Sequence, residues 1–254
     1  MPLIFSEPVD WQDLQNKVCL LLSQAGFEAE TEKVVSTPRG EVEIDVFAID
    51  PRSIDRIKYV VECKNWCNPV NQSVIHAFTT VMNETGCNIG YIVSKVGFQK
   101  GAIKYTDYTN IRLFSFTELQ NHYYMSWMKN HFAPELENHV ERCNLYLEPC
   151  NHARDNAVAG LNEIKTNVFK ELVVKYGSII FSLEMIALNI NYMGKVRLDE
   201  DYTAIDWTKL FEECDKIGLY LSGLPLSEVL LKLRDALQNI ATQFDELFDG
   251  DIFE

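Results

Sequence analysis

The segment that decides the fold is Gly-Glu-Val-Glu-Ile-Asp-Val-Phe-Ala at residues 40–48, followed by Val-Val-Glu-Cys-Lys-Asn-Trp at residues 60–66. Apolar and acidic residues alternate in the first part, and this alternation predicts a strand with one buried face. The second part predicts another strand, in which period two places Glu62 and Lys64 on the same face. If the two strands pair, Asp45 of the first strand approaches Glu62 and Lys64 across the sheet.

Helices and strands alternate outward from this segment. Asp10 is a plausible N-cap, and a helix is expected from there to Gly26. Turn residues separate the later elements, which are strands at 27–35, 41–48, 57–64, 88–94 and 111–116, and helices at 72–85 and 99–108. The order αβββαβαβ predicts a mixed sheet flanked by helices. Within the second strand, the side chains expected to share one face are Val42, Ile44, Val46 and Ala48.

The second half of the chain has helical periodicity almost throughout. Thr117 is expected to cap a helix rich in aromatic residues, which Pro134 ends, and further helices are expected from residue 158 to the end of the chain. The pattern predicts a first domain at residues 1–120, a connecting helix and loop at 121–150, and an all-α domain at 151–254.

Charge and cysteine content narrow the classes of protein. The chain has 23 basic and 37 acidic residues; the first 120 residues hold 11 and 15 of these (net −4), and the remainder hold 12 and 22 (net −10). An acidic surface repels phosphates, so contact with nucleic acid requires a local basic strip, metal ions or a partner. Seven cysteines in no compact pattern favour reduced thiols in the cytoplasm. The apolar stretch 179–193 is too short to cross a membrane, and no membrane association is expected.

Asp45, Glu62 and Lys64 together are suited to phosphate chemistry. Two carboxylates are typical protein ligands of Mg²⁺, which keeps several waters. A metal ion stabilises charge that develops on an attacked phosphate, and a nearby lysine can orient or deprotonate the attacking water. The alternative interpretation is a solvated sheet face that carries an ordinary salt bridge.

The sequence resembles the catalytic core of Mrr-like restriction endonucleases, a branch of the PD-(D/E)xK nuclease superfamily. Residues 40–48 and 60–66 carry the resemblance, and it continues through Gly-Tyr-Ile-Val-Ser at 90–94, Gly-Phe-Gln-Lys-Gly-Ala at 97–102 and Ile-Arg-Leu at 111–113. It covers about residues 14–119. The resemblance implies an αβββαβ restriction-endonuclease-like core, and Mg²⁺-dependent hydrolysis of DNA phosphodiester bonds in restriction or anti-phage defence. Mn²⁺ is expected to substitute for Mg²⁺.

The family's site residues can be carried over where positions match. Asp45 and Glu62 match the metal-binding acids, the backbone carbonyl of Cys63 matches a further metal ligand, and Lys64 matches the lysine that serves the attacking water. Many relatives carry a glutamate on the first helix, where this chain has Gln15, a poorer cation ligand. Glu43 either adds a ligand or lines the cleft, and we expect it to line the cleft.

Other side chains have less specific patterns. Lys95, Lys100 and Lys104 form either a basic strip for DNA phosphates or a solvated helix face. Four residues could in principle bind zinc, although their spacing fits no familiar zinc site and buried thiols are the expected interpretation: His139, Cys143, Cys150 and His152. All three signature residues are present, which favours an enzyme over a degenerate nuclease fold that binds DNA or protein within a larger defence complex.

The last helix has a narrow apolar seam, formed by residues that advance in steps of four and three: Leu226, Leu230, Leu233, Leu237, Ile240, Phe244 and Leu247. Such a seam either packs inside its own bundle or joins two chains. Because cutting both strands of a duplex needs two sites or one site acting twice, a homodimer through the C-terminal helices is expected. Absence of a DNA-reading motif in the helical half leaves DNA recognition to the nuclease domain or to a sensor or activator protein.

Overall fold

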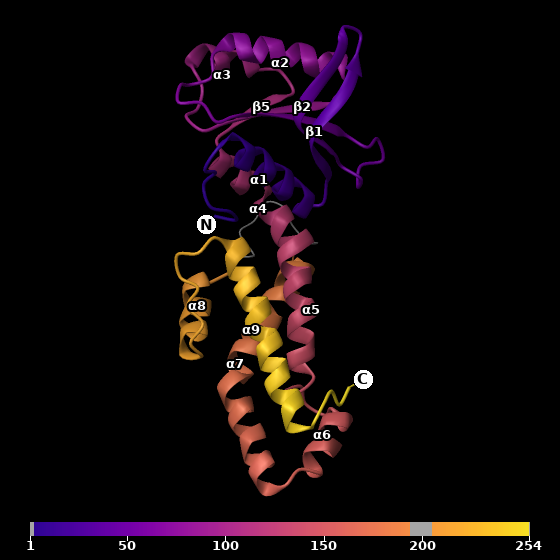
Figure 1. The fold of residues 1–254 in the computed structure, drawn as a ribbon, viewed down its shortest axis with the longest axis vertical. Coiled ribbons are helices and arrows are strands. Elements are labelled where there is room, and N and C mark those ends of the chain that lie inside the picture. The colour runs from indigo at the N-terminus through magenta and orange to yellow at the C-terminus, as the bar shows by residue number, and fades with distance from the viewer. Residues whose placement is uncertain (1–2, 194–204, 254) are drawn as a thin grey trace. The chain divides into compact units, whose positions relative to one another are not determined.

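The computed structural model describes residues 3–193 and 205–253 and divides the chain into two compact units, residues 1–130 and 131–254. The chain passes from the first unit to the second within a π-helical turn, Met128–Phe132. The segment 121–150, which was expected to connect two domains, is thus shared between the units. Figure 1 shows the order of the elements.

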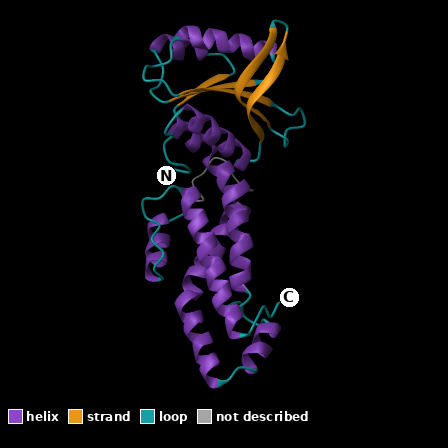
Figure 2. Cartoon of the chain, viewed as in Figure 1, coloured by secondary structure: helices purple, strands orange, loops and turns teal. Residues whose placement is uncertain are grey.

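A five-stranded sheet forms the centre of the first unit (Figure 2). The strands lie in sequence order: β1 (Glu28–Thr37), β2 (Gly40–Ile49), β3 (Lys58–Lys64), β4 (Ile89–Ser94) and β5 (Ile111–Phe114). The pairs β1–β2 and β2–β3 are antiparallel, whereas β3–β4 and β4–β5 are parallel. The expected mixed sheet and the order αβββαβαβ are therefore confirmed.

Helices cover both faces of this sheet (Figure 1). On one side are α1 (Trp11–Gln24) and α4 (Phe116–Trp127), and on the other are α2 (Gln72–Glu84) and α3 (Lys100–Thr106). Asp10 caps α1 as expected, because its side chain accepts the Asp13 N–H. The cap of α4 is Ser115 and not Thr117. Ser115 and Glu118 form a reciprocal capping box, which fixes the start of the helix at Phe116.

The core on the α2 side joins the sheet to α2 and α3, and it corrects one expectation about β2. Ile44 and Phe47 both belong to this core, although side chains three residues apart on a regular strand face opposite ways. Val42, Ile44, Val46 and Ala48 therefore do not share one face. The interruption lies at Asp45, which stands opposite Glu32 of β1, and Glu32 has a φ of 53°. The alternation of residue types could not reveal this change of face.

Gly90 explains why α2 packs closely on β4. A Cβ atom at this position would lie 2.6 Å from Cε1 of Phe78 and 2.8 Å from Sδ of Met82. Any larger residue would have to displace the Phe78 ring and the Met82 sulfur, so glycine allows these side chains of α2 to pack directly on β4.

The second unit is entirely helical in its described residues. It contains α5 (Ala133–Asn144), α6 (His152–Ala159), α7 (Glu163–Met193), α8 (Trp207–Lys216) and α9 (Leu226–Leu247). α9 packs on α5 and α7. All seven seam residues of α9 are buried within the unit, the most exposed being Leu247 at 9%. The seam thus packs inside its own bundle and offers no surface to a second chain, so the basis for the expected homodimer is removed.

The apolar stretch 179–193 is the second half of a longer helix. Residues Glu163–Asn191 of α7 are long and apolar enough, by length and composition, to cross a membrane, and 33% of the apolar window is buried inside the structure. The expectation that this stretch is too short is therefore corrected, because the helix begins at Glu163. Core helices of globular proteins meet the same criterion of length and composition.

Candidate functional site

The candidate site lies where β2 separates from β3. The ladder between these strands runs from Ile49–Lys58 to Val46–Val61, and beyond Val46 the chain of β2 pairs with β1 alone. Asp45 is the first residue past the ladder. Its Oδ2 accepts a hydrogen bond from the backbone N–H of Cys63 at 2.7 Å. This bond extends the contact between the strands by one residue and fixes the Asp45 carboxylate at the point of separation.

Glu62 and Lys64 share one face of β3, as period two predicts. Val60 on the same face is buried in the core beneath α2, so both side chains face the α2 side of the sheet. The ammonium of Lys64 and the carboxylate of Glu62 form an ion pair whose side chains are 18% and 29% exposed. A pair this sheltered is held more firmly than one on an open surface. The structure therefore brings together Asp45, Glu62 and Lys64.

The electrostatics of Glu62 reflect its crowded position. Burial raises the pKa of Glu62, the hydrogen bond from Lys64 acts in the opposite direction, and the nearby charge of Asp45 raises the pKa further. Two carboxylates that repel each other in a partly buried position are the arrangement that a divalent cation relieves.

Trp66 lies beside Lys64, and sequence reasoning gave it no role. The Nζ atom of Lys64 is 5.1 Å from the centroid of the Trp66 ring, within the range of a cation–π contact. Trp66 is 44% exposed. The only sequence signal for this contact is the spacing Lys-x-Trp at the end of a strand. This spacing predicts a contact only if the chain is known to turn back after Lys64.

Cys63 and Gln15 lie on the other side of the sheet. Burial raises the pKa of the Cys63 thiol well above its usual range, and the charges of Asp45 and Glu62 add to this effect, so the thiol stays neutral. Gln15 is 6% exposed on α1, one turn before Cys19, a neighbour that contributes to the raised pKa of the Cys63 thiol. Gln15 is thus placed on the α1 side, whereas Glu62 and Lys64 face the α2 side.

Two loops form a rim at the carboxyl ends of β3 and β4. The backbone N–H of Lys95 donates to the carbonyl of Lys64 at 3.0 Å, directly after the last paired residues of the two strands. Further along, the N–H of Val70 donates to Gly97 and the N–H of Gln99 donates to Val70, each at 2.9 Å. The loop that carries Trp66 is therefore anchored at both ends to the loop after β4.

The remaining predicted residues lie around this rim or farther from it. Lys95 is exposed at the strand ends beside Lys64, and Lys100 and Lys104 are exposed on α3. Glu43 is exposed on β2, where it pairs with Val34 of β1. Among the described residues no three or more His, Cys, Asp and Glu side chains are grouped to hold a metal ion.

The same result bears on the zinc alternative. His139, Cys143, Cys150 and His152 form no metal-binding group in the part of the chain that the structure describes. Cys143 is buried, and its thiol donates to the carbonyl of Leu237 at 3.2 Å. Cys143 thus packs as an ordinary core thiol, as expected, whereas Cys150 is exposed.

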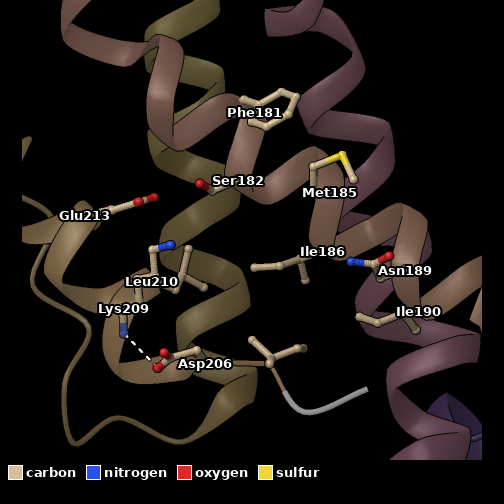
Figure 3. Close-up of a pocket in the computed structure, with 11 residues that line it drawn as sticks. Phe181, Ser182, Met185, Ile186, Asn189, Ile190, Asp206, Lys209, Leu210 and Glu213 are labelled. Carbon is tan, nitrogen blue, oxygen red and sulfur yellow. Dashed lines mark hydrogen bonds between the residues drawn. The ribbon is translucent and has the colours of Figure 1, made fainter. Parts of the chain in front are cut away.

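A pocket in the second unit contains none of the predicted site residues. It has a volume of about 280 Å³ and lies between α7 and α8 (Figure 3). Phe181 and Met185 of α7 and Leu210 of α8 give it an apolar wall, and Glu213 lies at its edge.

Comparison with known proteins bears on the first unit. Residues 7–123, a little under half of the chain, match a family model for the Mrr catalytic domain, described as a restriction endonuclease. The resemblance expected from the sequence is thereby confirmed, and it places Asp45, Glu62 and Lys64 inside the matched region. No curated protein matches the chain. A solved structure titled as a protein of unknown function, AF1548, matches with a TM-score of 0.38 and 15% identity over 92% of this chain and 99% of that chain.

Proposed function

We propose that the restriction-endonuclease-type domain of residues 7–123 hydrolyses DNA phosphodiester bonds with the help of Mg²⁺. The observation that carries this proposal is the convergence of Asp45, Glu62 and Lys64 at the point where β2 leaves β3. The three side chains come from two strands and supply two carboxylates and one ammonium in a partly buried position. An ordinary salt bridge between Glu62 and Lys64 does not account for a second carboxylate that raises the pKa of Glu62.

The residues present fit a divalent cation. Asp45 and Glu62 supply carboxylate oxygens, and the backbone carbonyl of Cys63 lies between Glu62 and Lys64 in the chain. Oδ2 of Asp45 accepts the Cys63 N–H, which leaves Oδ1 for the cation. Two or three protein ligands suffice because Mg²⁺ keeps several waters, and Mn²⁺ has similar ligand preferences. When bound, the ion would stabilise negative charge on the attacked phosphate.

Lys64 is proposed to act on the attacking water. Its ammonium is held on the same face as Glu62 and is 18% exposed, so it can reach a substrate at the rim while remaining ordered. A positioned ammonium can orient the water, take part in proton transfer and neutralise the developing charge. The ion pair with Glu62 orders the Lys64 ammonium in the free protein.

DNA reaches this site against an unfavourable overall charge. The chain carries a net charge of −14, so local cations must provide the first contact with phosphate. Lys95, beside Lys64 at the strand ends, is the best placed of the predicted lysines, and Lys100 and Lys104 on α3 extend the set. A role in restriction or anti-phage defence, a cytoplasmic location and a sensor or activator protein that supplies target recognition belong to the same proposal.

The proposal is tested by cleavage of plasmid and linear DNA with Mg²⁺ or Mn²⁺. Wild-type protein is expected to cut, and Lys64→Ala is expected to lower the rate by about 100-fold or more. Lys58→Ala is a matched control, because Lys58 is an exposed lysine at the other end of the same strand and should leave the rate unchanged. Cutting that persists undiminished in Lys64→Ala would remove the proposed site.

The alternative function is a degenerate nuclease fold that binds DNA or protein. It predicts that no metal ion or DNA substrate yields Lys64-dependent cutting, while the protein still binds DNA. The closeness of Asp45 to the sheltered Glu62–Lys64 pair favours the enzyme over a DNA-binding module, because carboxylates without a metal ion repel phosphate.

A further inference from the structure

The Lys64 ammonium has two neighbours of different kinds. One is the Glu62 carboxylate, with which it forms an ion pair, and the other is the face of the Trp66 ring, 5.1 Å from Nζ. The carboxylate is the same group that is proposed to bind the cation. A carboxylate that shares its charge with Mg²⁺ attracts an ammonium less strongly, so the ion pair alone would hold Lys64 least when the metal is bound.

The attraction between the Trp66 ring and the Lys64 ammonium is not weakened by a bound metal ion. This attraction comes from the ring quadrupole, which the cation does not neutralise. The loop that carries Trp66 is also tied down, by the Lys95–Lys64 hydrogen bond at its start and by the Val70–Gly97 and Gln99–Val70 bonds at its end. An exposed aromatic side chain on a free loop could not fix a neighbour, whereas one on this anchored loop can.

We propose that Trp66 is a positioning residue that keeps the Lys64 ammonium at the site when Glu62 turns to the metal ion. The inference rests on the proposed function and deepens it. The competing assignment is that Trp66 contacts DNA directly, since exposed aromatic rings at strand ends can stack on bases. The two assignments differ in which measured quantity changes when the ring is removed.

The contact itself can be tested without any cleavage. The chain contains four tryptophans, so full-length protein labelled with 5-fluorotryptophan should give four fluorine resonances, and Trp66→Phe identifies one of them. Lys64→Met is expected to shift the Trp66 resonance both without and with saturating Mg²⁺. Lys95→Met, which removes a neighbouring ammonium at the adjacent strand end, should leave it in place. A Trp66 resonance that does not respond to Lys64→Met with Mg²⁺ present would overturn the proposal.

The consequence for catalysis is a fall in kcat with an unchanged KM. Trp66→Leu is expected to lower kcat by about two- to fivefold, and Trp66→Phe, which keeps an aromatic face, to recover most of the loss. Trp11→Leu, at a tryptophan of α1 that is 55% exposed, should change nothing. In the Lys64→Met background Trp66→Leu should have no further effect, since the residues act together. A rise in KM alone assigns Trp66 to DNA contact instead, and equal losses in the Leu and Phe variants would overturn a role for the aromatic face.

The two proposals fail in distinguishable ways. Wild-type protein that cuts no DNA with any metal would remove the proposed function, while the fluorine resonances would still decide whether Trp66 holds Lys64. Conversely, cutting that depends on Lys64 and ignores Trp66 would leave the nuclease in place and remove the positioning role.

Discussion

Oδ2 of Asp45 lies 2.7 Å from the backbone nitrogen of Cys63, so a carboxylate proposed to bind metal also completes the contact between two strands. The two roles use different atoms and different properties of the side chain. The strand contact needs an oxygen that accepts a hydrogen bond, whereas the metal needs negative charge. Substitutions at this position can therefore separate structure from chemistry.

Asp45→Asn is expected to abolish cleavage while keeping the fold. The amide oxygen can still accept the Cys63 N–H, so the free energy of unfolding should change by less than about 1 kcal/mol. Loss of the charge should lower the cleavage rate by at least about 100-fold. Thermal melting and a plasmid assay measure the two effects. If Asp45→Asn unfolds the protein and a residual folded fraction still cuts, Asp45 is structural.

Asp45→Ala should damage both roles. The Cys63 N–H then has no acceptor at this place, and an unsatisfied group of this kind costs about 1–3 kcal/mol. The difference in free energy of unfolding between the Ala and Asn variants measures the hydrogen bond. Equal stabilities of the two variants would show that water replaces the carboxylate as acceptor.

Glu62→Gln should separate two effects of the Glu62 charge on the free energy of unfolding: the loss of stability without metal and the stabilisation by bound Mg²⁺. Burial and the charge of Asp45 raise the pKa of Glu62, which means that the folded state disfavours its charged form. At pH 7.5 without metal the Gln variant is therefore expected to be at least as stable as wild type. Mg²⁺ at ten times its Kd should stabilise wild type by about 1.4 kcal/mol and the variant much less. Equal stabilisation by Mg²⁺ would place the cation elsewhere.

Leu233→Asp should unfold the helical unit. Leu233 is 1% exposed in the α9 seam, and a carboxylate there costs at least about 3 kcal/mol. Leu231→Asp on the same helix is the control, because Leu231 is 48% exposed and a surface change costs less than about 0.5 kcal/mol. Denaturant titration followed by circular dichroism compares them. If wild-type protein is a dimer and Leu233→Asp is a folded monomer of 29.2 kDa, the α9 seam joins two chains after all.

The start of α4 gives a further test. Ser115→Ala removes one half of the capping box with Glu118, and a loss of about 1 kcal/mol in the free energy of unfolding is expected. Thr117→Ala lies outside the cap, and its hydroxyl donates only to Glu7 on the surface. A larger loss in Thr117→Ala than in Ser115→Ala, measured by thermal melting, would contradict the assigned cap.

The sequence predicted the element order of the first unit because its signals are local. Alternation, glycine and proline turns and the Asp10 cap depend on neighbouring residues, and the strands and helices lie within a few residues of the expected bounds. The pairing of Glu62 with Lys64 followed from period two alone. Asp45 was placed near them only by assuming that β2 pairs with β3.

Features that depend on tertiary context could not be predicted. The change of face between Ile44 and Phe47 arises where β2 leaves β3, and nothing in the residue types marks that point. Trp66 contacts Lys64 because the loop after β3 folds back, and the loop is fixed by backbone bonds that have no sequence signature. The sequence of the α9 seam is compatible with packing inside one chain and with packing between two chains, since helix periodicity does not identify the helix on which the seam packs.

The hydrogen bonds of Val70 with Gly97 and Gln99 also limit how this rim can diversify. A change in the length of the loop after β3 or of the loop after β4 would break these hydrogen bonds and displace the other loop. An insertion in one loop therefore requires a matching change in the other. New substrate preferences should therefore arise by substitution of side chains in these two loops, whose backbone path stays the same. Insertions should be tolerated in other parts of the domain.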